Sequence, residues 1–170
     1  MPCVSDVNNK KEAAYAASFL FTMQTMNIRQ ADKAEIKTIN QFYKQQAKGQ
    51  AKKGECIWLT EHKQQIIAAL RIQPLFDEPN SALLLGVFVD PNFRQQGIAS
   101  KLVTTACRNW QSDNADKTLY TFPYQKLTAW YQTLGFTSST RADLPLGIES
   151  RYKRYSELNK ELVVMRLSKR

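Results

Sequence analysis

Histidine is almost absent from this chain, since His62 is the only one in 170 residues, and cysteine occurs only at Cys3, Cys56 and Cys107. The cysteines are far apart and form no Cys-x-x-Cys pair, which excludes a disulfide framework and a zinc ribbon. One histidine cannot build a multi-histidine metal site, so we expect no metal. His62 stands in a polar stretch, where we expect an exposed side chain rather than a catalytic base.

Long apolar runs are also missing. None approaches the ~20 residues that span a bilayer, so we expect neither a transmembrane protein nor a membrane partner. Residues 10–21 combine two lysines with an apolar stretch, as a signal peptide does, but no small-residue cleavage site follows. The sequence therefore predicts a helical or disordered extension over 1–25, a single domain over 26–170, and a cytoplasmic protein with reduced thiols.

Positive charge is plentiful, because 24 Lys and Arg face 15 Asp and Glu, a net charge of +9. The excess lies at the ends: residues 1–53 carry +5, residues 54–140 are neutral and residues 141–170 carry +4. Nucleic-acid-binding domains concentrate basic residues on one recognition element, and the sequence contains no zinc finger, RNA-binding aromatic pair or basic helix. We therefore expect no nucleic-acid partner, and the charge favours only an anionic ligand.

Hydrophobic spacing predicts five strands. They are expected at 56–60, 66–72, 82–89, 119–122 and 162–167, the first two joined as a hairpin. The run 82–89 is almost continuously apolar, which is typical of a central strand buried on both faces.

Helices are predicted between the strands. Asp32 and Glu35 form a capping-box pattern before a helix that ends at Lys48-Gly49. A second helix begins at Gly97, a third covers 127–134 and stops at Gly135, and a fourth covers 148–158. This order describes a mixed α/β domain with one sheet and helices on its faces.

The segment from Val87 to Ser100 carries the clearest chemical signal. It leads from a buried strand through a Pro-containing turn into a helix whose first turn holds Gly97 and Ala99. Unpaired N–H groups at a helix start favour an anion, and small residues let a phosphate approach. Arg94, with the two glutamines after it, adds donors. The sequence has neither a Walker A loop nor a GxGxxG, so these residues alone leave a pyrophosphate site and an ordinary turn as equal alternatives.

Two motifs together resolve this ambiguity. Arg94-x-x-Gly97-x-Ala99 after an apolar strand resembles the Arg/Gln-x-x-Gly-x-Gly/Ala motif of the GCN5-related N-acetyltransferase (GNAT) superfamily. Some thirty residues later, the segment 129–136, Ala-Trp-Tyr-Gln-Thr-Leu-Gly-Phe, resembles that family's second signature. The order of elements fits from Ile28 to Leu167. The resemblance implies a twisted mixed sheet of six to seven strands with about four helices, splayed between the strands that end near Val89 and Phe122.

The resemblance further implies a site for acetyl-CoA as co-substrate in that splay. Backbone groups matching Val87 and Val89 would bind the pantetheine arm, with Phe88 between them. One of these amides would polarise the thioester carbonyl, since a fixed N–H aimed at developing oxyanion charge is worth several kcal/mol. The pyrophosphate would lie against the turn and first helical residues: Arg94, Gln95, Gln96, Gly97, Ile98, Ala99 and Ser100.

Tyr131 is the position of the family's usual general acid, which would protonate the departing CoA thiolate; a phenol of pKa ~10 is protonated at neutral pH. Tyr120 and Tyr124 lie nearby, and we expect both to be packing residues. The pattern departs from the family at Tyr124, where many members have an Asn that contacts pantetheine.

The strand 82–89 carries no carboxylate, although some family members place a general base there. The other carboxylates considered as a base are expected to be solvated surface charges: Glu61, Asp77, Glu78 and Glu149. A water chain serves equally well, and we assign no base.

These observations favour an N-acetyltransferase that moves the acetyl group of acetyl-CoA to a primary amine of a small molecule or peptide, by direct attack in a ternary complex. Cys107, in the middle of a helix, is expected to be a buried, inert thiol, which disfavours a covalent intermediate. The short segment 48–56 leaves little chain for a second helix, so the insertion 144–159 is expected to wall the acceptor site. A non-catalytic CoA-binding module of the same fold stays open, as does a homodimer.

Overall fold

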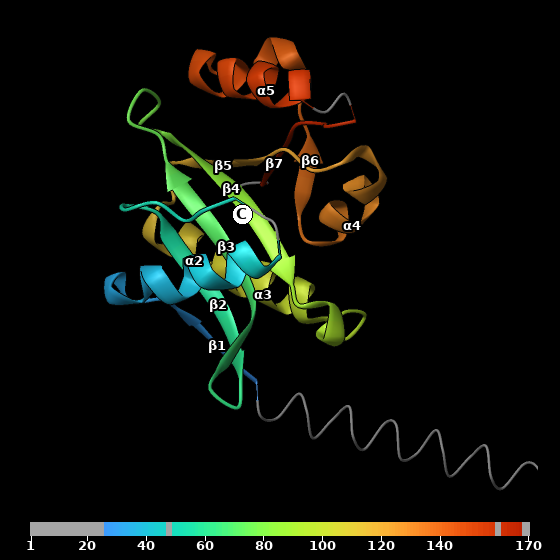
Figure 1. Ribbon diagram of the computed structural model, residues 1–170. Coiled ribbons are helices and arrows are strands. Elements are labelled where there is room, and N and C mark those ends of the chain that lie inside the picture. Colours follow the sequence, from blue (N-terminus) through green and yellow to red (C-terminus); the bar gives the residue numbers. More distant parts are fainter. Residues whose placement is uncertain (1–25, 47–48, 159–160, 168–170) are drawn as a thin grey trace, which may run out of the picture.

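The polypeptide forms one seven-stranded mixed sheet in the order β1-β2-β3-β4-β5-β7-β6 (Figure 1). The structure, a computed structural model, describes residues 26–46, 49–158 and 161–167. The strands are β1 (Met26–Gln30), β2 (Cys56–His62), β3 (Gln65–Pro74), β4 (Ser81–Val89), β5 (Thr118–Thr121), β6 (Phe136–Ser138) and β7 (Met165–Leu167). The helices are α2 (Ile36–Gln45), α3 (Ile98–Asp113), α4 (Thr128–Thr133) and α5 (Leu146–Leu158), with short 3-10 turns before several of them.

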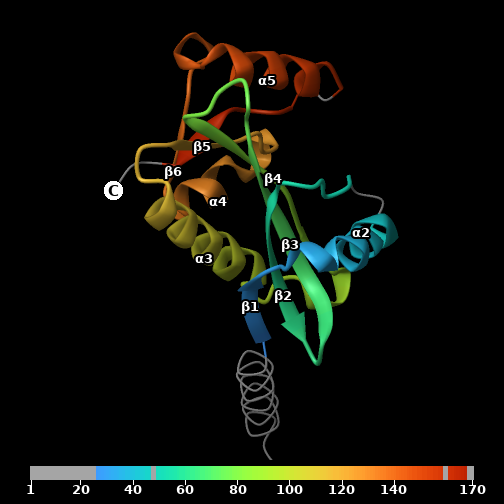
Figure 2. The ribbon, with the colours of Figure 1, turned by 90° about the vertical axis from the view of Figure 1, so that its left-hand side faces the viewer.

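The helices cover the two faces of this sheet (Figure 2). The long helix α3 packs on one face and buries the largest core cluster, which includes Leu84 and Leu102. The opposite face is shared: α2 covers the β2 and β3 side, and α5 covers β5 and the start of β4. No helix in the described part of the chain is long and apolar enough to cross a membrane.

Strand β4 lies at the centre of the sheet. It pairs antiparallel with β3 from Ala82 to Val89, and Asp90 N–H still donates to the Ile67 carbonyl at 2.8 Å beyond the last pair. The register slips by one residue between Leu85 and Phe88, and Gly86 there has a φ of +60°. This is a β-bulge at a backbone angle that glycine adopts without strain.

Local sequence explains most element ends. The Glu35 carboxylate accepts the Asp32 N–H at 2.7 Å, the capping box expected before the first helix. Lys63 and Gln64, both with positive φ, make the two-residue turn of the β2–β3 hairpin. Gly135, with a φ of +90°, ends α4 as predicted.

The sequence-based expectations were incomplete at both edges of the sheet. Strands β1 and β6 were not predicted, because five and three residues are too few for a two-residue period to stand out. The C-terminal strand was predicted too long, since β7 covers only Met165–Leu167. The expected extension 1–25 and the predicted helix end at Lys48 lie outside the described residues.

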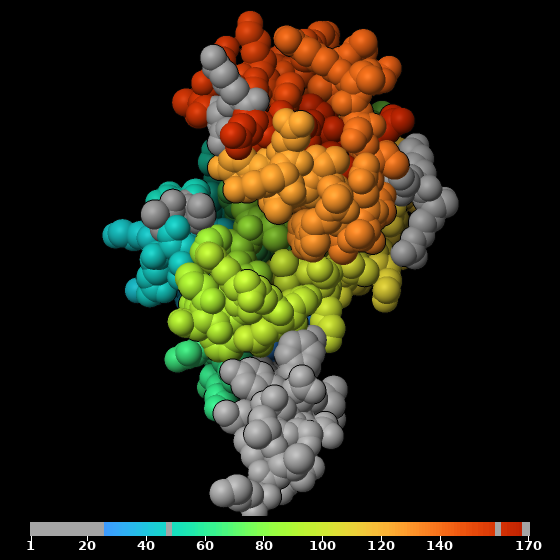
Figure 3. Space-filling view, turned by 90° about the vertical axis from the view of Figure 1, so that its right-hand side faces the viewer, coloured from blue at the N-terminus to red at the C-terminus, as the bar shows by residue number. Residues whose placement is uncertain are grey.

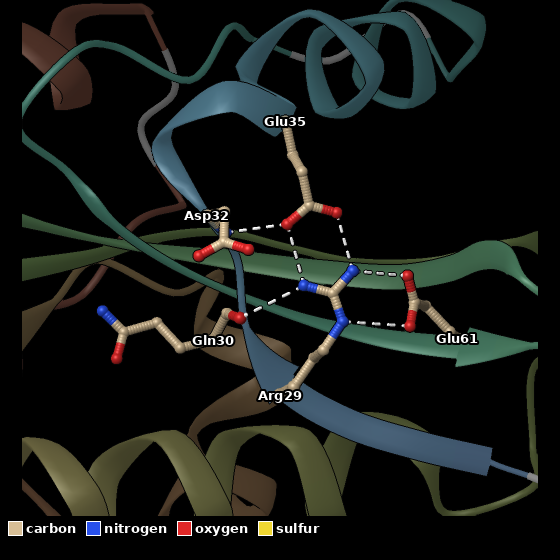
Figure 4. Close-up of polar contacts among 5 residues, drawn as sticks. All are labelled: Arg29, Gln30, Asp32, Glu35 and Glu61. Carbon is tan, nitrogen blue, oxygen red and sulfur yellow. Dashed lines mark hydrogen bonds and ion pairs between the residues drawn. The ribbon is translucent and has the colours of Figure 1, made fainter.

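An ion-pair cluster fixes the outer edge of the sheet (Figure 4). Arg29 on β1 donates to both Glu35 oxygens at 2.6 and 2.8 Å and to both Glu61 oxygens at 2.6 and 3.0 Å. Hydrogen bonding to Arg29 lowers the pKa of Glu35 to about 2. Because one guanidinium joins β1, β2 and the turn before α2, the cluster fixes β2 against β1 and the turn that follows β1.

Candidate functional site

A wedge opens between β4 and β5. The two strands pair in parallel only from Ser81–Thr118 to Leu84–Thr121, and β4 continues for five more residues. After Thr121 the chain turns away: the Pro123 carbonyl accepts the Val163 N–H at 2.9 Å, and Gln125 N–H donates to the Glu161 carbonyl at 2.7 Å. Beyond Leu84, this edge of β4 has no strand partner among the described residues, so its backbone groups are available to a ligand, apart from the Val89 carbonyl, which accepts from Arg94. The splay lies where the sequence predicted it.

The turn after β4 leads directly into α3. The Asp90 carboxylate accepts the Asn92 N–H at 2.9 Å and caps the 3-10 turn Pro91–Phe93. Gln95 and Gly97 both have positive φ, and Gly97 is the N-cap of α3. A Cβ at Gly97 would meet no atom within 4 Å, so the space before the helix is open. The first hydrogen bond within the helix runs from Lys101 N–H to the Gly97 carbonyl at 3.1 Å, which leaves the N–H groups of Ile98, Ala99 and Ser100 without helical partners.

Arg94 lies at the mouth of this turn. Its Nε donates to the Val89 carbonyl at 3.1 Å, and its guanidinium stacks 5.2 Å from the centroid of the Phe88 ring. The side chain is exposed, so its remaining N–H groups face solvent beside the start of α3. This arrangement places a fixed positive charge next to unpaired helix N–H groups, which suits a diphosphate.

The other predicted cofactor residues on β4 point to different faces. Phe88 is buried against α2, with its ring 5.9 Å from that of Phe42. Val87 and Val89 pack partly buried against the cluster under α3. Ile98 is also buried, so a ligand could reach only its backbone. Gln95 is exposed and Gln96 half-buried, and both have side chains within reach of solvent.

Tyr131 lies on the α3 face at the apex of the wedge. Burial raises its pKa to about 12, an effect that a hydrogen bond to the Thr121 side chain opposes. Thr121 pairs with Leu84 in the last rung before the strands separate, so the phenol stands where the open edge begins. Its ring packs edge-on against Phe136 at 5.3 Å. The predicted acid therefore lies at the splay, although only 5% of the residue is exposed in the absence of a ligand.

A direct contact joins the two motifs. Trp130 Nε1 donates to Ser100 Oγ at 3.1 Å, which connects α4 to the first turn of α3. Figure 3 views this side of the molecule: the yellow-green residues that follow β4 and the light-orange residues of α4 flank a shallow hollow in which the green of β4 is visible. The Ser100 hydroxyl is therefore engaged by the protein, while its backbone N–H stays at the helix start.

The four carboxylates considered as bases all have structural partners. Arg29 holds Glu61, and Arg151 holds Asp77 at 2.7 Å. The other two, Glu78 and Glu149, accept from the Gly147 N–H at 3.0 Å and from Arg141 at 2.8 Å. The pKa of Asp77 is lowered by its hydrogen bonds with Arg151. Asp77 is exposed, as expected, whereas Glu61, Glu78 and Glu149 are half-buried, so the expectation of solvated surface charges was incomplete for these three.

A buried polar cluster beside the bulge was missed at the sequence level. The Tyr43 hydroxyl donates to the Gly86 carbonyl at 2.8 Å, and Arg71 lies 5.4 Å over the Tyr43 ring. Arg71 also donates to the Gln50 carbonyl and pairs with the buried Glu55 at 3.1 Å. A Cβ at Gly86 would lie 3.0 Å from Arg71 Nε, so a side chain there would crowd Arg71 as well as strain the backbone at a φ of +60°. A lone arginine in the apolar run of β3 was the signal available in the sequence.

The structure agrees with the sequence-based expectation for some of the remaining candidate residues and differs from it for others. Cys107 is buried and its pKa is raised to about 12 by burial, as expected for an inert thiol. Tyr120 is buried, as predicted, but Tyr124 is 42% exposed, so the packing expectation for it was wrong. His62 is half-buried at the end of β2, with its ring 5.6 Å from that of Phe93, rather than exposed in a turn. Within the described ranges, no three His, Cys, Asp or Glu side chains gather as a metal site.

The insertion between β6 and β7 contains α5, and part of it lies beside the first residues after the last β4–β5 rung. Its C-terminal half presents Tyr155 and Leu158 to a hollow of about 290 Å³ whose other walls include Leu85 and Phe122. Residues 49–55, between α2 and β2, contain no helix, in line with the prediction from their length.

Comparisons with known proteins agree with this architecture. A search of curated protein sequences found no significant match. Three solved structures share the fold at low sequence identity. The chain matches N-acetylglutamate synthase from Neisseria gonorrhoeae, complexed with coenzyme A and N-acetyl-glutamate, at 16% identity and a TM-score of 0.63, covering 85% of this chain but only 35% of that one.

The second is the ribosomal-protein-S18-alanine N-acetyltransferase from Escherichia coli, at 17% identity and a TM-score of 0.55, covering 84% of this chain and 92% of that one. The third is a spermidine N-acetyltransferase chimera from Vibrio cholerae and hSSAT, at 13% identity and a TM-score of 0.57, covering 85% and 96%. A family model described as an acetyltransferase (GNAT) domain matches residues 53–138, which include β4, the turn, α3 and α4. The chain belongs to the GNAT acetyltransferase family.

Proposed function

We propose that residues 26–170 form an acetyl-CoA-dependent N-acetyltransferase that acetylates a primary amine by direct attack in a ternary complex. The single observation that carries this proposal is the wedge between β4 and β5, which has a helix N-terminus at its mouth and a buried phenol at its apex. Membership of the family and the coenzyme A in a structural neighbour support the choice of cofactor.

Acetyl-CoA would lie along the open edge of β4. Its pyrophosphate would accept from the free N–H groups of Ile98, Ala99 and Ser100, with Arg94 supplying a positive charge. Gln95, Gln96 and Gly97 would line the same anion site through their backbone. The pantetheine arm would pair with backbone groups of Val87 to Val89, as an added strand does, and one of these amides would polarise the thioester carbonyl.

The reaction requires one bond to form and one to break. The neutral amine nitrogen attacks the acetyl carbonyl carbon, the C–S bond breaks, and the electron pair leaves on the CoA sulfur. The amine loses one proton and the thiolate gains one, so the products are the N-acetyl amine and CoA thiol. We assign no protein base, because the carboxylates that the sequence offered are held in ion pairs and hydrogen bonds, and water can accept this proton.

Tyr131 would donate a hydrogen bond to the departing sulfur. Since its pKa is about 12 and that of a free thiol is ~8.5, complete proton transfer would be uphill by about 5 kcal/mol. The phenol would therefore stabilise the thiolate while keeping most of its proton, and solvent would complete the protonation after release. Tyr124, which stands at the family's usual Asn position, lines the hollow beside α5.

The alternative is a CoA-binding module without turnover, which the missing carboxylate on β4 keeps open. The two functions are separated by measuring acetyl-CoA binding calorimetrically and CoA thiol release with a panel of amines. The proposed function requires both binding and amine-dependent release. Binding without release from any amine would favour the module, and no binding would overturn both.

Two variants with a control locate the site. Arg94→Glu should weaken acetyl-CoA binding by about tenfold or more, because it places a negative charge beside the diphosphate. Arg108→Glu, on the exposed side of α3, makes the same charge change away from the turn and should leave binding unchanged. Tyr131→Phe should lower kcat by about a hundredfold with unchanged binding, since it removes only the donor to the sulfur. Full activity in this variant would show that Tyr131 is not the donor to the departing sulfur.

A further inference from the structure

A hollow on the α5 face begins where the two strands separate. Leu85 and Phe122 are the first residues after the last paired rung, Leu84–Thr121, and both line it. The hollow has a volume of about 290 Å³, and its other walls are Tyr124, Tyr155, Leu158 and Leu162. It therefore adjoins the proposed position of the thioester, but from the face opposite to Tyr131. Direct transfer needs an amine that can approach one face of the planar thioester carbonyl, and a hollow on this side leaves that approach separate from Tyr131.

The walls of this hollow are apolar and aromatic. The Phe122 ring packs edge-on against Tyr152 at 5.5 Å and lies 6.0 Å from the Tyr155 ring, which holds the aromatic wall rigid. Leu158 is 84% exposed and Tyr124 is 42% exposed, so a ligand would remove apolar surface from water that the free protein leaves hydrated. None of the six lining residues carries a carboxylate.

Positive charges stand at its rim. Lys126 Nζ lies 5.7 Å from the centroid of the Tyr124 ring, and the Arg154 guanidinium lies 5.8 Å from that of Tyr155. These cations occupy outer faces of the rings and repel a second cation on a ligand. They also disfavour protonation of the incoming amine, which must be neutral to attack.

A larger hollow elsewhere does not compete for this role. It measures about 830 Å³ and lies between β1, the start of α2 and residues 52–57. Strand β3 lies between β2, which lines this hollow, and β4, and the wedge is on the far edge of β4, so an acetyl group there could not reach an amine bound in this hollow.

We infer that the hollow formed by Leu85, Phe122, Tyr124, Tyr155, Leu158 and Leu162 is the acceptor pocket, and that it selects a primary amine carried on an aromatic or branched aliphatic group without a second positive charge. This inference rests on the proposed function. It assigns to α5 the selection of the acceptor, and it distinguishes this chain from an enzyme for polyamines.

The test compares acceptors of defined chemistry. With saturating acetyl-CoA, kcat/KM for 2-phenylethylamine and isoamylamine should exceed that for ethylamine by about tenfold or more, because each fills apolar space. Spermidine and glutamate should be worse than 2-phenylethylamine. A preference for spermidine or glutamate would overturn the inference while leaving the acetyltransferase function in place.

Variants on α5 test whether the acceptor binds in this pocket. Leu158→Ser and Tyr155→Ala should each raise KM for 2-phenylethylamine about fivefold without changing the affinity for acetyl-CoA. Leu146→Ser is the matched control, since Leu146 is 78% exposed at the other end of α5 and should behave as wild type. Unchanged KM values in both pocket variants would overturn the location.

A binding measurement keeps the two proposals distinguishable. Binding of 2-phenylethylamine to the full chain with CoA present is followed by NMR. Binding that Leu158→Ser weakens, without turnover, supports the pocket and contradicts the enzyme. Absence of binding in wild type contradicts the pocket whatever the activity.

Discussion

The two edges of β4 are used very differently. Along one edge the strand pairs with β3 over almost its whole length, and Asp90 extends the ladder by one more hydrogen bond. Along the other edge it pairs with β5 over four residues only, and five residues remain open. The same strand thus contributes to the stability of the sheet through one edge and can bind a ligand through the other. The paired half should respond to mutation mainly in stability, and the open half mainly in binding and turnover.

The largest expected effect tests the paired half. Leu84→Ala should lower the free energy of unfolding by about 3 to 4 kcal/mol, because Leu84 is fully buried under α3 and the vacated space cannot collapse. Val87→Ala, in the open half of the same strand and partly buried, should cost about 1 kcal/mol. Urea denaturation measures both. Equal losses would mean that the open half is as tightly packed as the paired half.

The second-largest effect concerns the buried phenol of Tyr131 at the apex of the wedge. An unfolded phenol ionises near pH ~10, whereas Tyr131 in the folded protein ionises near 12. Between these values the unfolded chain binds fewer protons, so stability falls as pH rises, by about 1.4 kcal/mol per pH unit for this group. Cys107 acts in the same direction from pH ~9. Tyr131→Phe should remove the contribution of this phenol to the fall in stability between pH 10 and 12. The urea midpoints of the variant and of wild type should therefore converge across this range. Parallel curves would show that the phenol is hydrated.

The third effect tests the contact that joins the two motifs across the open edge. Ser100→Ala removes the acceptor of the Trp130 indole N–H and should cost about 1 kcal/mol of stability. It should also weaken acetyl-CoA binding a few-fold, since α4 and the first turn of α3 would no longer be held together. Ser112→Ala, near the exposed end of α3, should change neither thermal unfolding nor calorimetric binding. A variant that loses stability but keeps full affinity would separate this contact from the cofactor site.

The smallest effect comes from the edge farthest from the wedge. Arg29→Gln breaks the pairs with Glu35 and Glu61, which are partly exposed, and should cost about 0.5 to 1 kcal/mol at pH 7. The pKa of Glu35 is lowered to about 2 in the folded protein, so this stability is present above pH ~4.5 and is lost as pH falls toward 2. Wild type and variant should therefore unfold alike at pH 2. Acetyl-CoA binding should not change, because β3 stands between β2, which carries Glu61, and β4.

Local sequence predicted the elements whose residue patterns are continuous along the chain. The apolar run of β4, the glycine that opens α3 and the stripe that ends at Gly135 are continuous signals, and the splay followed from the family resemblance. The cluster of Tyr43, Glu55 and Arg71 was not predictable in the same way, because its members come from three elements and meet only through sheet pairing and helix packing.

The insertion 144–159 was expected to wall the acceptor site, but the exposure of Leu158 in the proposed pocket escaped prediction for a related reason. Helical spacing correctly predicted a helix over 148–158, and that spacing favoured Leu158 as a packing residue, yet this side chain is largely exposed. Periodicity identifies which residues share a helix face, but it does not tell how far the partner surface extends beneath that face. Leu158 lies beyond the end of that surface, over the gap that the divergence of β4 from β5 creates.

The bulge at Gly86 also determines which side chains face which neighbour. Leu83 and Leu85 face the side covered by α5, and without an extra residue Val87 and Val89 would face the same way. Instead, Phe88 occupies that side against α2, and the two valines turn toward α3. Deletion of Gly86 would restore strict alternation and leave these three residues on their present faces, whereas pairing the full sequence without a bulge would exchange their surroundings. The bulge at Gly86 therefore allows β4 to pack against α5 before it and against α2 after it. The change in side-chain alternation marks the point where β4 passes from its paired half to its open half.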